Sequence, residues 1–288
     1  MTAETTTTSR STLPITAPTL VTGGTGKTGR RVAAGLAARG LPVRIGSRSA
    51  EVPFDWDDPT TWRAALRGTR AAYLAFVPDL AVEGSTDAIR ALSAIAFEEG
   101  VQRLVLLSGR GEPAAQRSEE VVLGSGIPAT VVRASWFAQN FSEGYLLDGV
   151  LSGVVALPAD AVREPFVDVD DLAELAVAAL TEDGHAGRVY EATGPELLTF
   201  ADAVAEIAAA TGREIAYQPL PMSVWTAEMA RHGVPDDVLD LLRFLFTEVL
   251  DGRNESTADG VAQGLGRPAR PFRWFARRAA AAGAWSAS

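Results

Sequence analysis

The sequence contains no cysteine, two histidines and a single lysine in 288 residues. Without cysteine, disulfide bonds and thiolate catalysis are excluded, and this composition is typical of a cytoplasmic protein. The two histidines have no acidic partners at ligand spacing, so we expect no metal site. No apolar run is long enough to span a bilayer, and we expect no membrane partner.

Positive charge is scarce as well, because 26 basic residues against 36 acidic ones give a net charge of −10. The basic residues are dispersed along the chain, which argues against nucleic acid as a partner. Residues 1–17 are rich in Thr and Ser and lack the apolar core of a signal peptide, so we predict a disordered leader.

The most informative stretch is 19–29, where an apolar strand enters a glycine cluster that opens a helix. Gly23, Gly26 and Gly29 form a G-x-x-G-x-x-G pattern, which allows a tight turn, close approach of a pyrophosphate and close packing of the helix. Free N–H groups at the start of that helix favour an anion. The predicted dinucleotide site consists of Gly23, Thr25, Gly26, Lys27, Thr28 and Gly29.

Two neighbouring features indicate which nucleotide to expect. Val21 stands where a P-loop requires glycine, so hydrolysis of a nucleoside triphosphate is disfavoured. A second short strand at 41–46 is followed by Ser47 and Arg48. An acidic residue there would bind the ribose of NAD, whereas an arginine suits the additional phosphate of NADP. NADP(H) is therefore the predicted cofactor, with a solvated surface arginine as the alternative interpretation of Arg48.

Strands and helices alternate through the first half of the chain. Strands are predicted at 51–54, 71–76, 102–109 and 127–133, with helices at 86–99 and 112–123. This alternation predicts an α/β fold with a Rossmann-type, doubly wound parallel sheet that binds ligands at the C-terminal ends of its strands. The residues expected at those ends are Asp55 and Trp56 near the adenine, Phe76, Val77 and Pro78 over the cofactor, and Ser108.

Beyond Asn140 the alternation is lost. A helix is predicted at 141–150, a strand at 154–156, and a helix starting at Asp170 as its N-cap. We predict an NADP-binding domain at 18–140, completed by about 165–193. A smaller, mostly helical lobe at 141–164 and 194–288 would bind the substrate.

Four stretches carry a resemblance to a known family, at 21–30, 54–59, 135–144 and 193–199. From about residue 19 to Trp285 the chain resembles the NmrA-like atypical short-chain dehydrogenases, and most of all the ergot-alkaloid type reductases. The glycine motif is widespread, whereas Trp-Phe-x-x-Asn-Phe and Gly-Pro-Glu-Leu-Leu-Thr are more specific. The resemblance implies an NADP(H)-binding Rossmann domain and reduction of an imine, enone or ketone. The family also includes a redox-sensing regulator without catalysis.

The usual catalytic pair of short-chain dehydrogenases is missing. Those enzymes use a serine with Tyr-x-x-x-Lys, in which the lysine lowers the tyrosine pKa. Lys27 is the only lysine of the sequence, so the pair is absent. Ser108 stands where the family's serine would be, and Tyr145 is a candidate proton donor with plain packing as its alternative role. Reduction of an iminium needs no proton donor, and conjugate reduction of an enone or quinone could take a proton from water or Ser108.

Trp136, Phe137 and Asn140 follow the strand at 127–133 and are predicted to line the substrate pocket. Core packing of the two aromatic residues and turn formation by Asn140 are the alternatives.

We therefore predict an NADPH-dependent oxidoreductase that reduces a C=N (iminium), C=C or C=O bond of a small organic molecule or secondary metabolite, as a monomer or homodimer. One alternative is an NADP(H)-sensing regulator without turnover. The other is a non-redox cyclase or isomerase that uses the nucleotide as a scaffold.

Overall fold

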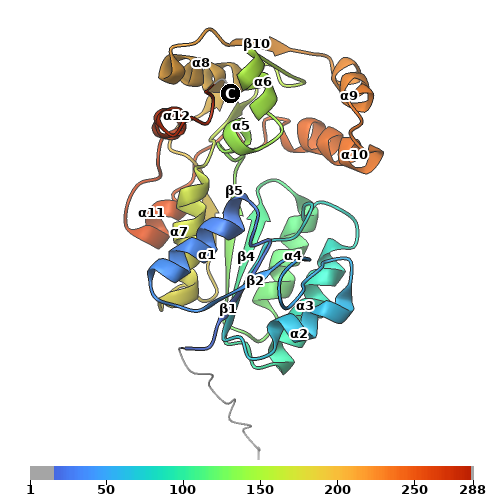
Figure 1. Cartoon of the computed structure of the whole chain (residues 1–288), viewed down its shortest axis with the longest axis vertical. Helices are drawn as coiled ribbons and strands as arrows, with labels where there is room; N and C mark the ends of the chain where they lie inside the picture. Colours follow the sequence, from blue (N-terminus) through green and yellow to red (C-terminus); the bar gives the residue numbers. More distant parts are fainter. Residues whose placement is uncertain (1–15, 287–288) are drawn as a thin grey trace, which may run out of the picture.

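A six-stranded sheet forms the centre of the larger part of the molecule (Figure 1). The computed structural model describes residues 16–286, so residues 1–15 of the predicted leader lie outside the described residues. The strands follow the order β2-β1-β3-β4-β5-β8, and every neighbouring pair is parallel. They are β1 (Thr19–Thr22), β2 (Val43–Gly46), β3 (Ala71–Leu74), β4 (Arg103–Gly109), β5 (Ala129–Ala134) and β8 (Val189–Ala192).

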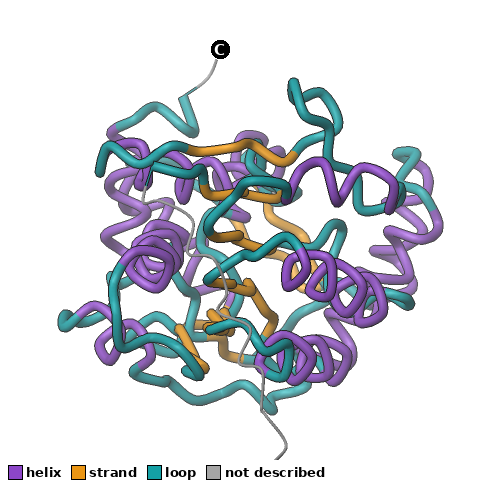
Figure 2. Tube along the Cα trace, turned by 90° about the horizontal axis from the view of Figure 1, so that it is seen from below, coloured by secondary structure: helices purple, strands orange, loops and turns teal. Residues whose placement is uncertain are grey.

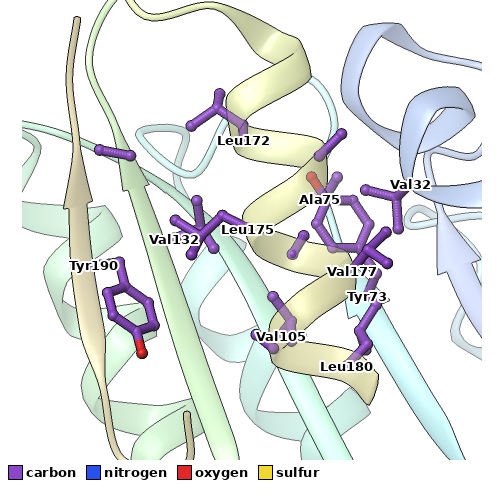
Figure 3. Packing of buried hydrophobic residues seen from close by; sticks show 14 of the residues in the cluster. Val32, Tyr73, Ala75, Val105, Val132, Leu172, Leu175, Val177, Leu180 and Tyr190 are labelled. Carbon is purple, nitrogen blue, oxygen red and sulfur yellow. The ribbon is translucent and has the colours of Figure 1, made fainter. Parts of the chain in front are cut away.

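Helices cover both faces of this sheet (Figure 2). One face packs against α1 (Lys27–Ala38), α7 (Val169–Thr181) and α11 (Gly260–Leu265). The other face packs against α2 (Trp62–Leu66), α3 (Ser85–Glu98) and α4 (Pro113–Leu123). All residues of β1 and β3 are buried, as expected for strands covered on both faces. Figure 3 shows Leu172 and Leu175 of α7 beside Val132 of β5. The predicted Rossmann-type, doubly wound α/β fold is confirmed.

A smaller lobe lies beyond the C-terminal ends of the strands (Figure 1). Its aromatic core includes Phe141, Phe166, Phe200, Phe272 and Trp285. Its helices are α5 (Asn140–Glu143), α6 (Leu147–Ser152), α8 (Phe200–Thr211), α9 (Met222–Arg231), α10 (Asp236–Phe244), the π-helical turn η2 (Leu245–Val249) and α12 (Phe272–Ala281). Its strands are β6 (Val154–Leu157), β7 (Arg163–Glu164), β9 (Leu198–Thr199) and β10 (Ala216–Pro219).

Two predicted elements are wrong, for identifiable reasons. Residues 51–54 form no strand; they lie in a loop that carries Phe54 into the core and closes on the 3-10 turn Pro59–Thr61. The predicted helix at 141–150 is broken at Gly144. Gly144 has extended backbone angles, so the helix ends there although the apolar pattern continues.

The start of α7 also differs from the prediction. Its N-cap is Asp168, whose carboxylate accepts a hydrogen bond from the Asp170 N–H at 2.9 Å, and not Asp170 itself. Both are acidic residues close to the first turn, and the sequence pattern does not distinguish them. In the part of the chain that the structure describes, no helix combines the length and the apolar character needed to cross a membrane.

Candidate cofactor and substrate site

The glycine loop connects β1 to α1 at the C-terminal edge of the sheet. The Gly26 N–H donates to the Gly23 carbonyl at 2.8 Å, and Gly23 has a positive φ of 60°. A Cβ on Gly29 would lie 2.7 Å from the Gly23 carbonyl carbon and 2.9 Å from Gly24 Cα, so only glycine fits there. No side chain caps the start of α1, which leaves its first N–H groups for an anion. These features fit a dinucleotide pyrophosphate.

A cavity of about 530 Å³ opens next to this loop. It extends from the glycine loop, past the ends of β3 and β4, to the residues that follow β5, and it is closed on the far side by Leu245 and Val249 of η2. The predicted site residues that line it are Gly23, Thr25, Gly26, Lys27, Thr28, Phe76, Val77, Pro78, Ser108, Trp136, Phe137, Asn140 and Tyr145. One cavity thus brings the cofactor loop and the predicted substrate residues together.

Five predicted residues do not line this cavity: Gly29, Ser47, Arg48, Asp55 and Trp56. Gly29 packs against Gly23 beneath the loop. Trp56 is 8% exposed, and its indole N–H donates to the Ala75 carbonyl at 3.0 Å, which fixes the ring in the core. Arg48 is exposed immediately after β2, at the same edge of the sheet as the glycine loop.

Lys27 links the cofactor loop to the substrate side of the cavity. Its Nζ donates to Asn140 Oδ1 at 2.8 Å, and Asn140 begins α5. Burial lowers the pKa of the Lys27 ammonium, and the Glu143 carboxylate partly opposes that shift. Arg31 of α1 forms an ion pair with Glu143 of α5 at 2.7 Å. This ion pair and the hydrogen bond from Lys27 to Asn140 hold α1 and α5 together.

Ser108 is buried at the end of β4 and gives its proton to another protein group. Its Oγ donates to Glu119 Oε1 at 2.6 Å, and Glu119 also accepts from Arg133 Nε at 2.9 Å. The ion pair with Arg133 keeps Glu119 as an acceptor. In this arrangement the Ser108 hydroxyl proton is directed away from the cavity.

Tyr145 lies at the mouth of the cavity and is 43% exposed. Burial of its hydroxyl end raises the pKa of the phenol, and the Trp136 indole opposes that rise. Trp136 Nε1 is buried and completes no hydrogen bond with any described residue. The indole lies close enough to the Tyr145 hydroxyl to lower its pKa but forms no complete hydrogen bond with it, so this donor beside the cavity suits a ligand carbonyl.

Three acidic residues of the cavity wall were not predicted from the sequence: Asp79, Glu112 and Glu164. Glu164 is 2% exposed, its Oε1 has no partner among the described residues, and burial raises the pKa of its carboxyl to about 8. Asp79 and Glu112 follow the ends of β3 and β4 within a few residues, and that position was the available signal. Within residues 16–286 no group of His, Asp and Glu side chains is arranged to hold a metal ion.

Replacing Glu164 with glutamine is expected to flatten the dependence of unfolding free energy on pH. The folded pKa is about 8. The unfolded value is about 4.3, so between the two the folded state holds an extra proton. Stability from this group is complete below the unfolded pKa and falls as pH rises through the folded pKa, by at most about 1.4 kcal/mol per pH unit.

Urea unfolding from about pH 5 to about pH 9 measures this slope. The exposed Glu214→Gln is the matched control. Equal slopes in Glu164→Gln and the unchanged protein would contradict a protonated Glu164.

The parallel sheet, the glycine loop and the cavity define a dinucleotide-binding protein of the Rossmann type. No protein-family model matches the chain. It is 36% identical to the (4-alkanoyl-5-oxo-2,5-dihydrofuran-3-yl)methyl phosphate reductase of Streptomyces griseus, over 91% of this chain and 98% of that protein. It is 28% identical to agroclavine dehydrogenase of Claviceps fusiformis, over 89% and 95% of the two chains. It is 26% identical to prestalk A differentiation protein A of Dictyostelium discoideum, over 90% and 91%.

The chain therefore belongs to the NmrA-like atypical short-chain dehydrogenase/reductase family, in its ergot-alkaloid reductase branch, and the predicted oxidoreductase class is confirmed.

Solved structures show the same fold. Triphenylmethane reductase of Citrobacter complexed with NADP(H) matches with a TM-score of 0.73 at 19% identity, over 91% of this chain and 99% of that one. The NADPH-dependent quinone oxidoreductase of Escherichia coli complexed with NADPH gives 0.72 at 21%, over 90% and 99%. The negative transcriptional regulator NmrA in complex with NAD gives 0.66 at 15%, over 91% and 95%.

Proposed function

We propose that this protein is an NADPH-dependent reductase that adds hydride to a polarised double bond of a small organic molecule. The bond is a C=C conjugated to a carbonyl, an iminium C=N or a C=O. The observation that carries the proposal is the single cavity of about 530 Å³ shared by the glycine loop and by Trp136, Phe137 and Asn140. NADPH supplies the hydride when it is bound, and the chain supplies its position.

The described residues have separate tasks in this proposal. The N–H groups at the start of α1 hold the pyrophosphate, and Phe76, Val77 and Pro78 cover the cofactor. Trp136 and Phe137 give the reacting end an apolar wall that excludes water. The lobe formed by 141–164 and 194–288, apart from α11 on the sheet, closes the cavity with Leu245 and Val249 and selects the substrate.

The charges of the cavity favour a substrate without a phosphate group. The Streptomyces griseus relative is named for a phosphorylated substrate whose ring C=C is conjugated to a carbonyl. Here Asp79, Glu112 and Glu164 line the cavity, and burial raises the pKa of Glu112 to about 9 and that of Glu164 to about 8, so near neutral pH Asp79 is the charged carboxylate of the three. Arg110, the one arginine of the lining, already donates to Glu191, Asn254 and Ser256. A conjugated carbonyl compound or a cation therefore suits this cavity better than a phosphate monoester does.

Deuterium transfer tests the function directly. Two samples of NADPH, each carrying deuterium on a different face of the nicotinamide C4, are incubated separately with the protein and a panel of enones, quinones and cyclic iminium ions. We expect one deuterium atom in the product from one of the two labelled forms and none from the other. Oxidation of NADPH without deuterium in any product, or no oxidation at all, would contradict the proposal.

Replacing Arg48 with alanine is expected to weaken NADPH binding at least about 10-fold and to change NADH binding little, because in this proposal the Arg48 guanidinium pairs with the 2′-phosphate. Fluorescence titration with each nucleotide measures both dissociation constants. Arg90, also exposed but on α3, is the matched control as Arg90→Ala. Equal losses for the two nucleotides would refute this role of Arg48.

A further inference from the structure

The carboxyl group of Glu112 occupies a space that a side chain at residue 109 would otherwise fill. Gly109 ends β4 directly after Ser108, and a Cβ built on it would overlap the Glu112 carboxyl. Glu112 is 6% exposed, and it lines the cavity. Its acid group therefore lies at the strand end, beside the serine whose own proton goes to Glu119.

Glu112 is not held there by the usual role of an acidic residue at a helix start. It occupies the N-cap position of α4, yet its side chain makes no capping hydrogen bond. Its Oε2 is buried and has no partner among the described residues. A buried carboxylate without donors is costly, so the group needs either a proton or a ligand.

The neighbouring groups favour the proton. Asp79, from the loop after β3, approaches Glu112 closely enough for the two carboxyl groups to share one proton through a hydrogen bond. Burial, followed by the Asp79 charge, raises the pKa of Glu112 to about 9. Burial raises the pKa of Asp79 as well, but the Ala81 N–H, which donates to its carboxylate at 2.8 Å, and the Glu112 carboxyl both oppose that rise, which leaves the shared proton on Glu112.

The other charges around Glu112 are already paired. Glu119 of α4 faces it and raises its pKa further, but Glu119 is paired with Arg133 of β5. Arg253 donates to the Gly111 carbonyl and pairs with Asp251 at 2.6 Å. Neither arginine forms an ion pair with the Glu112 carboxyl.

We propose that Glu112, with Asp79 as its positioning partner, is the proton donor for reduction of neutral conjugated substrates and replaces the missing Tyr-x-x-x-Lys pair. This inference rests on the proposed function. It assigns to one side chain the proton that iminium reduction does not need.

The step balances with NADPH as the reductant. The C–H bond at the nicotinamide C4 breaks, and its electron pair forms a C–H bond at the β-carbon of the enone. The electrons of the C=C bond move toward the carbonyl oxygen, which takes the Glu112 proton. The product leaves as the enol and becomes the saturated ketone in water. The Glu112 carboxylate regains a proton from water at the cavity mouth.

The test compares two substrates with the Glu112→Gln variant, which keeps the shape of the side chain and removes its acidic proton. Cyclohexenone needs a proton, whereas the N-methylpyrrolinium cation needs hydride alone. We expect kcat for cyclohexenone to fall about 100-fold or more, with pyrrolinium changed by no more than about 3-fold. Glu120→Gln, an exposed position on the same helix, is the control for loss of one acid.

A second variant guards against misfolding of the first. Asp79→Asn keeps the oxygen that accepts from Ala81 and removes the repelling charge. We expect the high-pH limb of the cyclohexenone profile to move to lower pH, because Glu112 then ionises more readily. The pyrrolinium reaction should show no such limb.

Infrared spectroscopy supplies a readout without turnover. The unchanged protein at neutral pH should show a protonated carboxyl C=O band that is absent from Glu112→Gln. Absence of that band, or equal losses for the two substrates, overturns the role of Glu112 and leaves the reductase proposal intact. Absence of deuterium transfer to both substrates by the unchanged protein overturns the proposed function, and the proton-donor role falls with it.

Discussion

The Gly29→Ala variant is expected to lose NADPH binding by about 100-fold or more, which corresponds to about 2.7 kcal/mol. The added Cβ would lie 2.7 Å from the Gly23 carbonyl carbon and 2.9 Å from Gly24 Cα. Both contacts are with backbone, so no rotamer change relieves them. The loop has to move away from α1, and the N–H groups at the helix start lose their position relative to the pyrophosphate.

Fluorescence titration with NADPH measures the loss, and circular dichroism checks that the variant is folded. The matched control is Gly35→Ala on the same helix, where the added Cβ would meet the side chain of Val177 at 3.0 Å and no part of the loop. We expect the control to bind NADPH normally. A folded Gly29→Ala protein with unchanged affinity would place the pyrophosphate elsewhere.

The Trp285→Ala variant is expected to lose about 3–5 kcal/mol of unfolding free energy. Trp285 is 2% exposed and packs edge-on against Phe275 at 5.9 Å. Its indole N–H donates to the Phe141 carbonyl at 2.8 Å. The substitution therefore opens a cavity in the lobe and leaves a buried carbonyl of α5 without its donor.

Urea unfolding measures this change, with Trp274→Ala as the control. Trp274 is 38% exposed and lies under Arg270 and Arg278 on the surface of α12. We expect it to cost about 1 kcal/mol or less. Similar losses of unfolding free energy for the two variants would contradict the larger stabilising role expected of the buried Trp285.

The sheet could be predicted from the sequence because its strands are short apolar runs separated by amphipathic helices. β1, β3, β4 and β5 all fall within the predicted ranges or one residue beyond them. The failure at 51–54 has a local cause: a proline and two large apolar residues look like an edge strand, yet they pack as a loop under the adjoining turn. The break at Gly144 was hidden because the apolar pattern runs on across it.

The cavity could be predicted in outline because parallel strands end at one edge, and residues after those ends converge there. Glu112 and Asp79 could not be singled out. Their significance depends on burial, on the absence of a side chain at Gly109 and on the approach of two loops from different strands. Those are properties of tertiary packing, and an acidic residue at a helix start is ordinarily a cap.

The position of Lys27 in the cavity wall has a practical consequence for chemical labelling. Lys27 is the only lysine of the sequence, so among side chains it is the one target of reagents that acylate amines. Burial lowers its pKa, which leaves more of the reactive free amine at mildly alkaline pH. Because Lys27 lines the cavity, protection from such a reagent reports on occupancy by a ligand that absorbs no light. With no cysteine to compete, a thiol introduced anywhere in the lobe gives a second, independent label.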